Sequence, residues 1–412
     1  MHHGDCRDVL AQMARDGVLF DACVTDPPYE LAFMGRKWDD TGVAFDPATW
    51  RAVYDVMRPG AHLLAFGGTR TQHRLVCAIE DAGFEIRDSI TWITGQGFPK
   101  SFDVSKAIDR VAGLKGSNGA AKLYADGREH HYDIGWRHDA KRAGRFDYTP
   151  ATPEAAAWAG WGTALKPAHE NICVARKPMD GTVAENVLRH GCGGLNIDAS
   201  RVPSEARPLI VKVAAPSGGG AHQSLPSRQM VYRENMAGSK SVGTTDLGRW
   251  PANVIHDGSP EVEAAFAAFG ERNSGGQIKH NKAKPLSVAK NRVYAHTTFG
   301  HGDTGSAARF FFSAKASAAD RAGSKHPTVK PQTLMRHLCT LVTPPGGHVL
   351  DPFAGSGSTL QAALRCGFLA TGIEREVEYV RDTRARLALP QVDDDDAEPT
   401  CRTDPAQRSL FP

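Results

Sequence analysis

The amino-acid sequence predicts a doubly wound α/β fold, in which helices cover both faces of a mostly parallel β-sheet. One observation is a glycine-rich turn at residues 351–359, which joins a strand-like apolar run to a helix-like run. A second is the alternation of helical and strand patterns over residues 20–93 and again after residue 331. A third is the loss of that alternation between residues 94 and 308, where Gly, Pro, Ser, Asn and Arg dominate. The sheet is therefore expected to be built from both ends of the chain, around a long insert.

The glycine-rich turn begins at Asp351 and contains Gly355 and Gly357. Glycine lets the backbone turn tightly and approach a ligand that a Cβ would push away. In a doubly wound sheet, the first strand–turn–helix unit is where nucleotides bind. A plain strand–helix turn and a dinucleotide site fit the same residues, although the third glycine of a dinucleotide fingerprint is missing. No Gly-Lys-Ser/Thr follows, so a phosphate-gripping loop is not expected.

A second turn, Asp26-Pro27-Pro28-Tyr29, follows the apolar run at residues 20–24 and therefore also sits at the carboxyl end of a predicted strand. Two adjacent prolines cannot enter the hydrogen-bond ladder of a sheet and make the loop rigid. Such a loop offers a carboxylate on Asp26, a free carbonyl on Pro27 and a flat ring on Tyr29. An ordinary proline turn would also account for these four residues alone.

The remaining elements follow from periodicity. Helical patterns occupy residues 9–19, 47–57 and 71–82, strands are expected at residues 61–66 and 170–177, and residues 84–93 alternate like an edge strand. After the insert, we expect a strand at residues 309–315, a helix at 332–341, the strand and helix flanking the glycine turn at 347–350 and 360–365, a second strand at 369–374 and a last helix at 376–389.

The composition of the chain argues against several classes of protein. The 412 residues are 41% hydrophobic, which permits a full core, and no apolar run reaches the length of a membrane span. The amino terminus leads into a polar segment, so no secretory signal is expected. The eight cysteines include no Cys-x-x-Cys pair, so no disulfide framework or metal site is expected. A net charge of +3 is too small to indicate a partner by itself.

The glycine turn and the Asp-Pro-Pro-Tyr loop together resemble the amino-methylating DNA methyltransferases. The loop precedes the glycine turn in the chain, and this circularly permuted order resembles the group called beta. The segment His326-Pro-Thr328-Val-Lys330-Pro resembles the same group's lead-in to its first cofactor strand. The resemblance covers roughly residues 1–100 and 310–390. It implies a Rossmann-like sheet, with residues 170–177 as the antiparallel strand that closes its edge.

The resemblance further implies S-adenosylmethionine as methyl donor and double-stranded DNA as substrate. Glu374, at the end of the second strand, is expected to bind the ribose hydroxyls. Asp5 and Cys6 end the strand whose acid faces the adenine, although Asp5 could equally be a helix cap. The predicted cofactor-binding residues are Asp5, Cys6, Asp26, His326, Thr328, Lys330, Asp351, Pro352, Phe353, Ala354, Gly355, Ser356, Gly357, Thr359 and Glu374.

The predicted catalytic residues are Asp26, Pro27, Pro28 and Tyr29. An exocyclic amine is a poor nucleophile because its lone pair is delocalised into the ring. The Asp26 carboxylate and the Pro27 carbonyl can accept both of its N–H groups and stabilise the developing positive charge, while Tyr29 stacks on a flipped base. In this family an acid at the first loop position more often accompanies adenine N6, and serine accompanies cytosine N4. Adenine N6 is therefore favoured, with cytosine N4, an RNA or protein methyltransferase and a catalytically dead DNA-binding homologue as alternatives.

The predicted domains are a catalytic half of the core at residues 1–98, an insert at 99–168, a core strand at 169–178, a target-recognition region at 179–308, a cofactor half at 309–390 and an acidic tail at 391–412. Between residues 275 and 302, basic residues are interleaved with aromatics and no acid occurs, which suits phosphate contacts and base stacking. A solvated loop is the alternative. The predicted DNA-binding residues are Lys279, Lys282, Lys284, Lys290 and Arg292.

Three further expectations concern the whole chain. The strand before Gly4 looks short, so the true start is expected to lie upstream. The terminal segment at residues 407–411, Gln-Arg-Ser-Leu-Phe, resembles peptides that dock on the bacterial sliding clamp. The protein is expected to be cytoplasmic, bacterial or phage-encoded and associated with the nucleoid, and a homodimer is left open.

Overall fold

A computed structural model describes the chain at residues 1–31, 41–95, 101–121, 146–212, 239–273, 304–314, 320 and 329–388. The chain divides into two compact units, unit 1 at residues 1–95 and 169–412 and unit 2 at residues 96–168. Within the described ranges, no helix combines the length and the apolar character that a membrane span requires.

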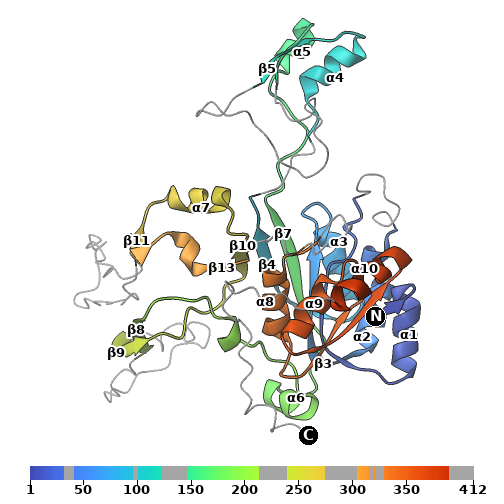
Figure 1. Cartoon of the computed structure of the whole chain (residues 1–412), viewed down its shortest axis with the longest axis vertical. Coiled ribbons are helices and arrows are strands. Elements are labelled where there is room, and N and C mark those ends of the chain that lie inside the picture. The colour runs from blue at the N-terminus through green and yellow to red at the C-terminus, as the bar shows by residue number, and fades with distance from the viewer. Residues whose placement is uncertain are drawn as a thin grey trace, which may run out of the picture. The chain divides into compact units, whose positions relative to one another are not determined.

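Unit 1 is built on a nine-stranded sheet (Figure 1). Every neighbouring pair is parallel except the two pairs made by β7, which runs against both of its neighbours. The strand order is β1 (His2–His3), β15 (Leu369–Glu374), β14 (His348–Asp351), β2 (Phe20–Thr25), β3 (Met57–Gly67), β7 (His169–Arg176), β4 (Glu85–Ile93), β10 (Val254–His256) and β13 (Phe312–Ser313).

The register places the two predicted turns side by side. Leu350 of β14 pairs with Cys23 of β2, so the glycine turn and the Asp-Pro-Pro-Tyr loop leave adjacent parallel strands at the same edge. The amino-terminal strand β1 pairs with β15, as the permuted order requires. The predicted doubly wound sheet is therefore confirmed.

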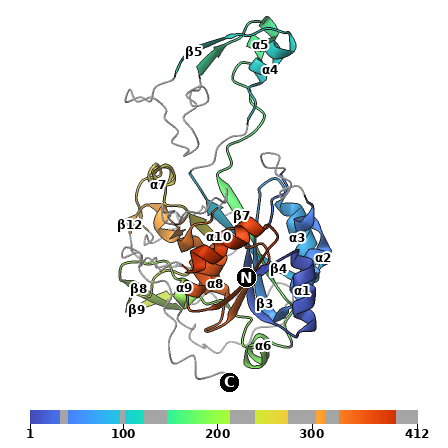
Figure 2. The same cartoon turned by 45° about the vertical axis from the view of Figure 1, so that its right-hand side comes forward.

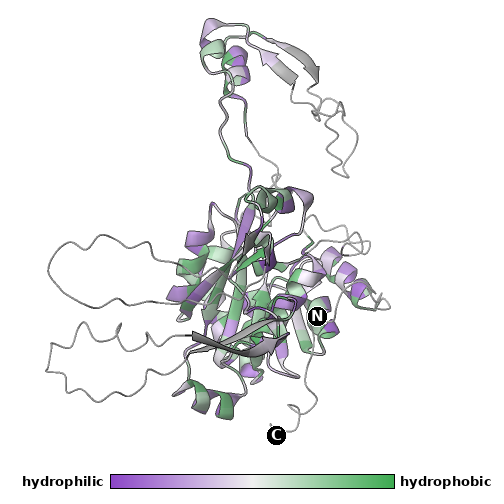
Figure 3. Cartoon of the chain, turned by 90° about the vertical axis from the view of Figure 1, so that its left-hand side faces the viewer, coloured by the Kyte–Doolittle hydropathy of each residue, from purple (hydrophilic) through white to green (hydrophobic). Residues whose placement is uncertain are grey.

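Helices cover both faces of this sheet, which buries its apolar rows on each side (Figure 2). Leu10, Trp50 and Ile79 pack one face from α1 (Cys6–Arg15), α2 (Pro47–Asp55) and α3 (Gln72–Asp81). Leu338 and Ala362 pack the other face from α8 (Gln332–Val342) and α9 (Ser358–Arg365). The last helix, α10 (Val377–Ala388), contacts α9, β15 and β1. Hydrophobic colouring accordingly gathers in the sheet in Figure 3.

Three strand predictions need correction. The strand expected to close the sheet, β7, lies inside it between β3 and β4, because its residues 172–176 are buried and pair on both sides. The expected edge strand, β4, pairs with β10 beyond it, since alternation reports a buried side-chain row and not a free edge. The strand expected at residues 309–315 is a 3-10 helix, Ala307–Phe310, followed by the short β13, because the Ser306 hydroxyl accepts from the backbone of Ala308 and starts a helical turn.

The remaining elements of unit 1 are short. They comprise the helices α6 (Val183–His190) and α7 (Pro260–Ala267), the 3-10 helices Val43–Phe45 and Asp198–Ser200, and two hairpins, β8 (Arg207–Lys212) with β9 (Ser239–Thr245) and β11 (Arg272–Asn273) with β12 (Thr304–Gly305). Unit 2 comprises α4 (Val104–Val111), β5 (Ser117–Ala121), β6 (Phe146–Thr149) and α5 (Pro153–Ala157). The Asp109 carboxylate joins its parts by accepting hydrogen bonds from Tyr148 and Thr152.

Candidate active site

The glycine turn is held from inside by Asp351, which is 1% exposed. Its Oδ1 accepts hydrogen bonds from Thr25 Oγ1 at 2.7 Å and from the backbone N–H of Phe353 at 3.1 Å. Burial raises the pKa of Asp351 to about 6, although hydrogen bonds from Thr359 and Thr25 oppose the shift. Because Thr25 immediately precedes Asp26, this contact ties the two turns directly together.

The backbone of the turn bends at Gly355 (φ 49°) and Gly357 (φ 78°), both in the left-handed region that favours glycine. A Cβ on Gly357 would lie 2.5 Å from the Thr383 side chain of α10. Thr383 donates to the Gly355 carbonyl at 2.9 Å, and the Arg386 guanidinium donates to the Ser356 carbonyl. Phe353 and Gly355 are half-buried, whereas Pro352, Ala354, Ser356 and Thr359 are buried. The surface that the turn offers to a ligand is therefore formed at Phe353 and Gly355.

Glu374 ends β15 beside this turn. Its Oε2 accepts from the Gly355 N–H at 2.9 Å, and its Oε1 accepts from the Glu376 N–H at 2.7 Å. Burial raises the pKa of Glu374, and the backbone hydrogen bonds oppose that shift. The carboxylate is fixed by the backbone and keeps lone pairs for hydroxyl donors.

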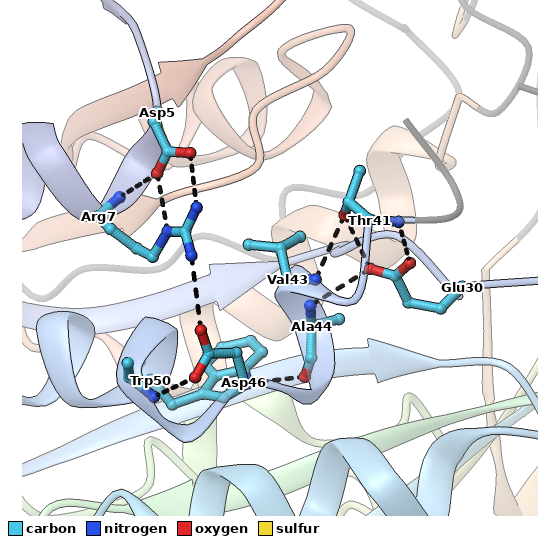
Figure 4. A network of polar contacts seen from close by, with 9 residues as sticks. Asp5, Arg7, Glu30, Thr41, Val43, Ala44, Asp46 and Trp50 are labelled. Atoms are coloured by element: carbon cyan, nitrogen blue, oxygen red, sulfur yellow. Dashed lines mark hydrogen bonds and ion pairs between the residues drawn. The ribbon is translucent and has the colours of Figure 1, made fainter. Parts of the chain in front are cut away.

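Asp5 caps α1 and is also bound by the Arg7 side chain (Figure 4). The Asp5 carboxylate accepts from the Arg7 backbone N–H at 2.9 Å and from the Arg7 guanidinium at 3.0 and 3.1 Å, and Arg7 reaches Asp46 at 3.5 Å. Burial raises the pKa of Cys6 to about 12, so its thiol is neutral. The helix-cap interpretation of Asp5 is therefore confirmed, and its predicted contact with the cofactor stays a prediction.

The two carboxylate oxygens of Asp26, in the Asp-Pro-Pro-Tyr loop, differ in their contacts with the described part of the chain. Asp26 Oδ2 lies 3.1 Å from Lys330 Nζ, while Oδ1 is buried and has no hydrogen-bond partner among the described residues. The Tyr29 carbonyl accepts from Thr71 Oγ1 at 2.8 Å, and the Tyr29 ring lies against Gly68, where an added Cβ would come within 3.1 Å of it. The loop is thus fixed at both ends, with one acceptor atom left over.

Sequence reasoning missed Glu170, which contacts this loop from the start of β7. Tyr29 donates its hydroxyl to Glu170 Oε2 at 2.8 Å, and Lys330 Nζ lies 2.9 Å from the same oxygen and 3.0 Å from the Tyr29 hydroxyl. Lys330, predicted to bind the cofactor, thus makes polar contacts with the Asp26 loop and with Glu170. The cofactor contact stays a prediction.

Glu30 was also missed. It is the one non-glycine residue with positive φ (52°) in the described part of the chain. Its carboxylate accepts from the backbone and hydroxyl of Thr41 at 2.7 and 3.1 Å and from the Gly42 N–H at 2.8 Å, as Figure 4 shows for Thr41. Backbone strain of this kind persists where surrounding contacts over-determine it, and it clusters at functional sites.

Several predicted residues lie outside the described ranges. They are His326, Thr328, the basic residues Lys279, Lys282, Lys284, Lys290 and Arg292, and the tail from residue 389 onward. Across the residues that are described, no group of three or more His, Cys, Asp or Glu side chains is arranged to hold a metal ion.

The two turns meet at the switch point of a Rossmann-like sheet in permuted order, which is where doubly wound sheets bind their ligands. The chain belongs to the N6/N4 methyltransferase family described as DNA methylase, whose family model matches residues 20–385. This family depends on S-adenosylmethionine.

Individual relatives match shorter stretches. The chain is 44% identical over 63 residues to the type II methyltransferase M2.DpnII of Streptococcus pneumoniae. These 63 residues are 15% of this chain and 24% of that protein. The chain is also 50% identical over 66 residues to YubD of Escherichia coli, an inferred methylase. These 66 residues are 16% of this chain and 29% of that protein. The chain thus spans less than a third of the length of the curated relatives that it matches.

Among solved structures, the M1.HpyAVI–SAM complex aligns over 94% of this chain and 98% of its own, with 15% identity and a TM-score of 0.40. Because the sequence identity and the TM-score are both low, the family assignment rests on the family model.

Proposed function

We propose that this protein transfers a methyl group from S-adenosylmethionine to the N6 amine of adenine in DNA. The observation that carries the proposal is Asp26 Oδ1, a buried acceptor that none of the described residues binds. Its loop is tied to the glycine turn through Thr25 and Asp351. A buried unpaired carboxylate oxygen costs free energy unless a ligand donor satisfies it. An exocyclic amine supplies such a donor.

The residues around the glycine turn fit S-adenosylmethionine. Phe353 and Gly355 leave the turn accessible, Glu374 holds a fixed carboxylate beside it for ribose hydroxyls, and Asp5 lies at the end of the next strand, β1. When bound, the cofactor supplies a methyl group already activated by its sulfonium. The protein then contributes positioning and electrostatic stabilisation, and no covalent intermediate with the enzyme is needed.

The loop residues would act on the base. Asp26 Oδ1 and the Pro27 carbonyl accept the two N–H groups of the amine, which draws the nitrogen toward tetrahedral geometry. The same carboxylate stabilises the positive charge that appears on nitrogen as the methyl arrives. The ring of Tyr29 offers a flat surface for a base that has left the duplex. Cytosine N4 presents the same amine geometry and is the second candidate, disfavoured by the acid at position 26.

The test is transfer of labelled methyl from S-adenosylmethionine to duplex DNA, RNA and protein in parallel, with Asp26→Ala as control. We expect label in DNA alone, and none above background with the variant. Label in RNA or protein with none in DNA would overturn the substrate assignment. Absence of transfer to all three, with S-adenosylmethionine still binding, would favour a catalytically dead DNA-binding protein.

We further propose that the basic stretch at residues 275–302 contacts DNA phosphates. Neutralising Lys279, Lys282 and Lys284 should reduce the slope of log affinity against log salt by roughly 0.9 for each phosphate that the protein no longer neutralises. Arg15→Gln, at the exposed carboxyl end of α1, serves as the control and should leave the slope unchanged. An unchanged slope in the triple variant would end this assignment.

The carboxyl-terminal segment is proposed to dock on a bacterial sliding clamp. Leu410 and Phe411 would fill an apolar pocket, Gln407 would fix the register, and the preceding acidic residues would act as a tether. The test is retention of purified clamp by the wild-type protein and by the Leu410→Ala/Phe411→Ala variant. Equal retention by both, or by neither, would refute docking.

A further inference from the structure

Three separate segments bring charged side chains together behind Asp26. Lys330 lies just before α8, Glu170 is the second residue of β7, and Asp26 directly follows β2. Lys330 Nζ is 3.1 Å from Asp26 Oδ2, 2.9 Å from Glu170 Oε2 and 3.0 Å from the Tyr29 hydroxyl, and the lysine side chain is only 9% exposed. The cluster holds one cation and two carboxylates.

A cation this buried is costly unless opposite charges surround it. Burial alone lowers the pKa of Lys330, but Asp26 and Glu170 outweigh it and raise that pKa above its usual range. Burial raises the pKa of Glu170, but the Lys330 ammonium and the Tyr29 hydroxyl outweigh it and lower that pKa. Lys330 is therefore protonated, and Glu170 is a carboxylate.

We propose that Lys330 and Glu170 are positioning residues for methyl transfer. Lys330 binds Asp26 through Oδ2, which leaves Oδ1 to accept the target amine, and its positive charge favours the carboxylate form of Asp26 against the opposing effect of burial. Glu170 holds Lys330 in position and compensates its charge. This inference rests on the proposed function of Asp26.

The charges around Asp26 set the direction of each expected effect. Burial raises the pKa of Asp26, Lys330 lowers it by charge and hydrogen bond, Glu170 raises it by like charge, and Tyr29 lowers it through its hydroxyl. Among the described residues, Asp351 is a further titratable group coupled to Asp26, whose charge raises the pKa of Asp351. Removing Lys330 should therefore move protonation of Asp26 to higher pH, and removing Glu170 should move it to lower pH.

The experiment measures the pH dependence of kcat for wild type, Lys330→Met and Glu170→Gln at saturating S-adenosylmethionine and DNA. An opposite charge at this distance shifts a carboxyl pKa by about 1–3 units. We expect the midpoint of the acidic limb in the Lys330→Met profile to move to higher pH by ~1 unit or more. In the Glu170→Gln profile, the same midpoint should move to lower pH than in wild type.

A matched control lies on the same strand. Arg176 pairs with Glu85 at 2.6 Å near the far end of β7, and its side chain is also 9% exposed. Arg176→Met removes a similarly buried cation away from the candidate site, so it should change thermal stability without moving the acidic limb. Glu170→Gln leaves Lys330 paired with Asp26, so it is expected to fold and tests the inference even if Lys330→Met does not.

Two results would overturn the inference. The first is a loss of rate in both variants with the acidic limb unmoved, which would make the cluster only structural. The second is a weaker affinity of Lys330→Met for S-adenosylmethionine with unchanged kcat, which would return Lys330 to the cofactor site. Infrared titration of the 13C-labelled Asp carboxyls in the free enzyme reports the Asp26 shift without turnover. If Lys330→Met leaves the pKa of Asp26 unchanged in that titration, the role of the cluster is refuted. If the pKa of Asp26 shifts but the wild-type protein transfers no methyl group, the proposed function is refuted instead.

Discussion

Asp26→Asn removes one negative charge from the candidate site and little else. Asparagine has the same shape as aspartate, and its amide can still occupy the place of the carboxylate. Lys330 keeps Glu170 at 2.9 Å, so the substitution leaves no buried ammonium without a partner. We therefore expect a folded protein with unimpaired binding of S-adenosylmethionine.

The expected loss of rate follows from the distance at which the carboxylate would act. A full charge on nitrogen about 3 Å from a carboxylate oxygen is worth about 5 kcal/mol at an effective dielectric constant of 20. Part of this remains through the neutral amide, and removal of one oriented group at a reacting centre typically costs about 10²–10³ in kcat. We expect kcat to fall by about three orders of magnitude, equivalent to ~4 kcal/mol.

The assay is single-turnover transfer of labelled methyl to duplex DNA, with cofactor affinity measured by calorimetry on the same preparation. A change in cofactor Kd of no more than about threefold, or about 0.7 kcal/mol, would show that the cofactor pocket is intact. A variant rate within tenfold of wild type would refute the role of Asp26 as acceptor. A matching collapse of cofactor affinity would place Asp26 in the cofactor pocket instead.

Other substitutions test the surrounding contacts. Tyr29→Ala should reduce kcat more than Tyr29→Phe, because base stacking needs the ring; equal losses would contradict stacking. Gly355→Val should weaken S-adenosylmethionine binding at least tenfold in calorimetry, because a β-branched residue is strained at φ 49°. Glu374→Ala should also weaken it, because the carboxylate that is proposed to bind the ribose hydroxyls is lost. Unchanged affinity in both variants would refute the proposed cofactor pocket. The pKa of Asp351 is raised by burial to about 6 in the folded state, so its contribution to stability is largest below about pH 4 and falls by up to ~3 kcal/mol as pH rises through 6. Asp351→Asn should flatten that slope in urea unfolding between pH 4 and 7, and an unaltered slope would assign it to other groups.

The adjacency of the two turns could be predicted from sequence because acids at the carboxyl ends of parallel strands meet where the winding reverses. The pairing of β14 with β2 and the contact of Thr25 with Asp351 agree with that rule. The position of β1 beside β15 followed from the permuted order of the motifs.

Glu170 could not be predicted, because its contact with Tyr29 joins residues 141 positions apart and depends on where β7 enters the sheet. The sequence predicted that β7 closes the edge of the sheet. In the structure β7 lies between β3 and β4, and this position brings Glu170 next to the loop. Lys330 was assigned to the cofactor because its motif precedes the cofactor strand, yet its described polar contacts are with Asp26, Glu170 and Tyr29. A motif gives the residue type, and the fold decides which neighbour it contacts.

The proposed methylation of adenine N6 is tested most directly in DNA from cells that express the wild-type chain or Asp26→Asn. The DNA is digested completely and its nucleosides are analysed by mass spectrometry. A host strain without its own adenine methylation gives a clean background. We expect N6-methyladenine in DNA from cells expressing wild type and its near absence with Asp26→Asn. N4-methylcytosine in place of N6-methyladenine would contradict the assignment of the base, and unmodified DNA from cells containing folded wild-type protein would contradict the assignment of the activity.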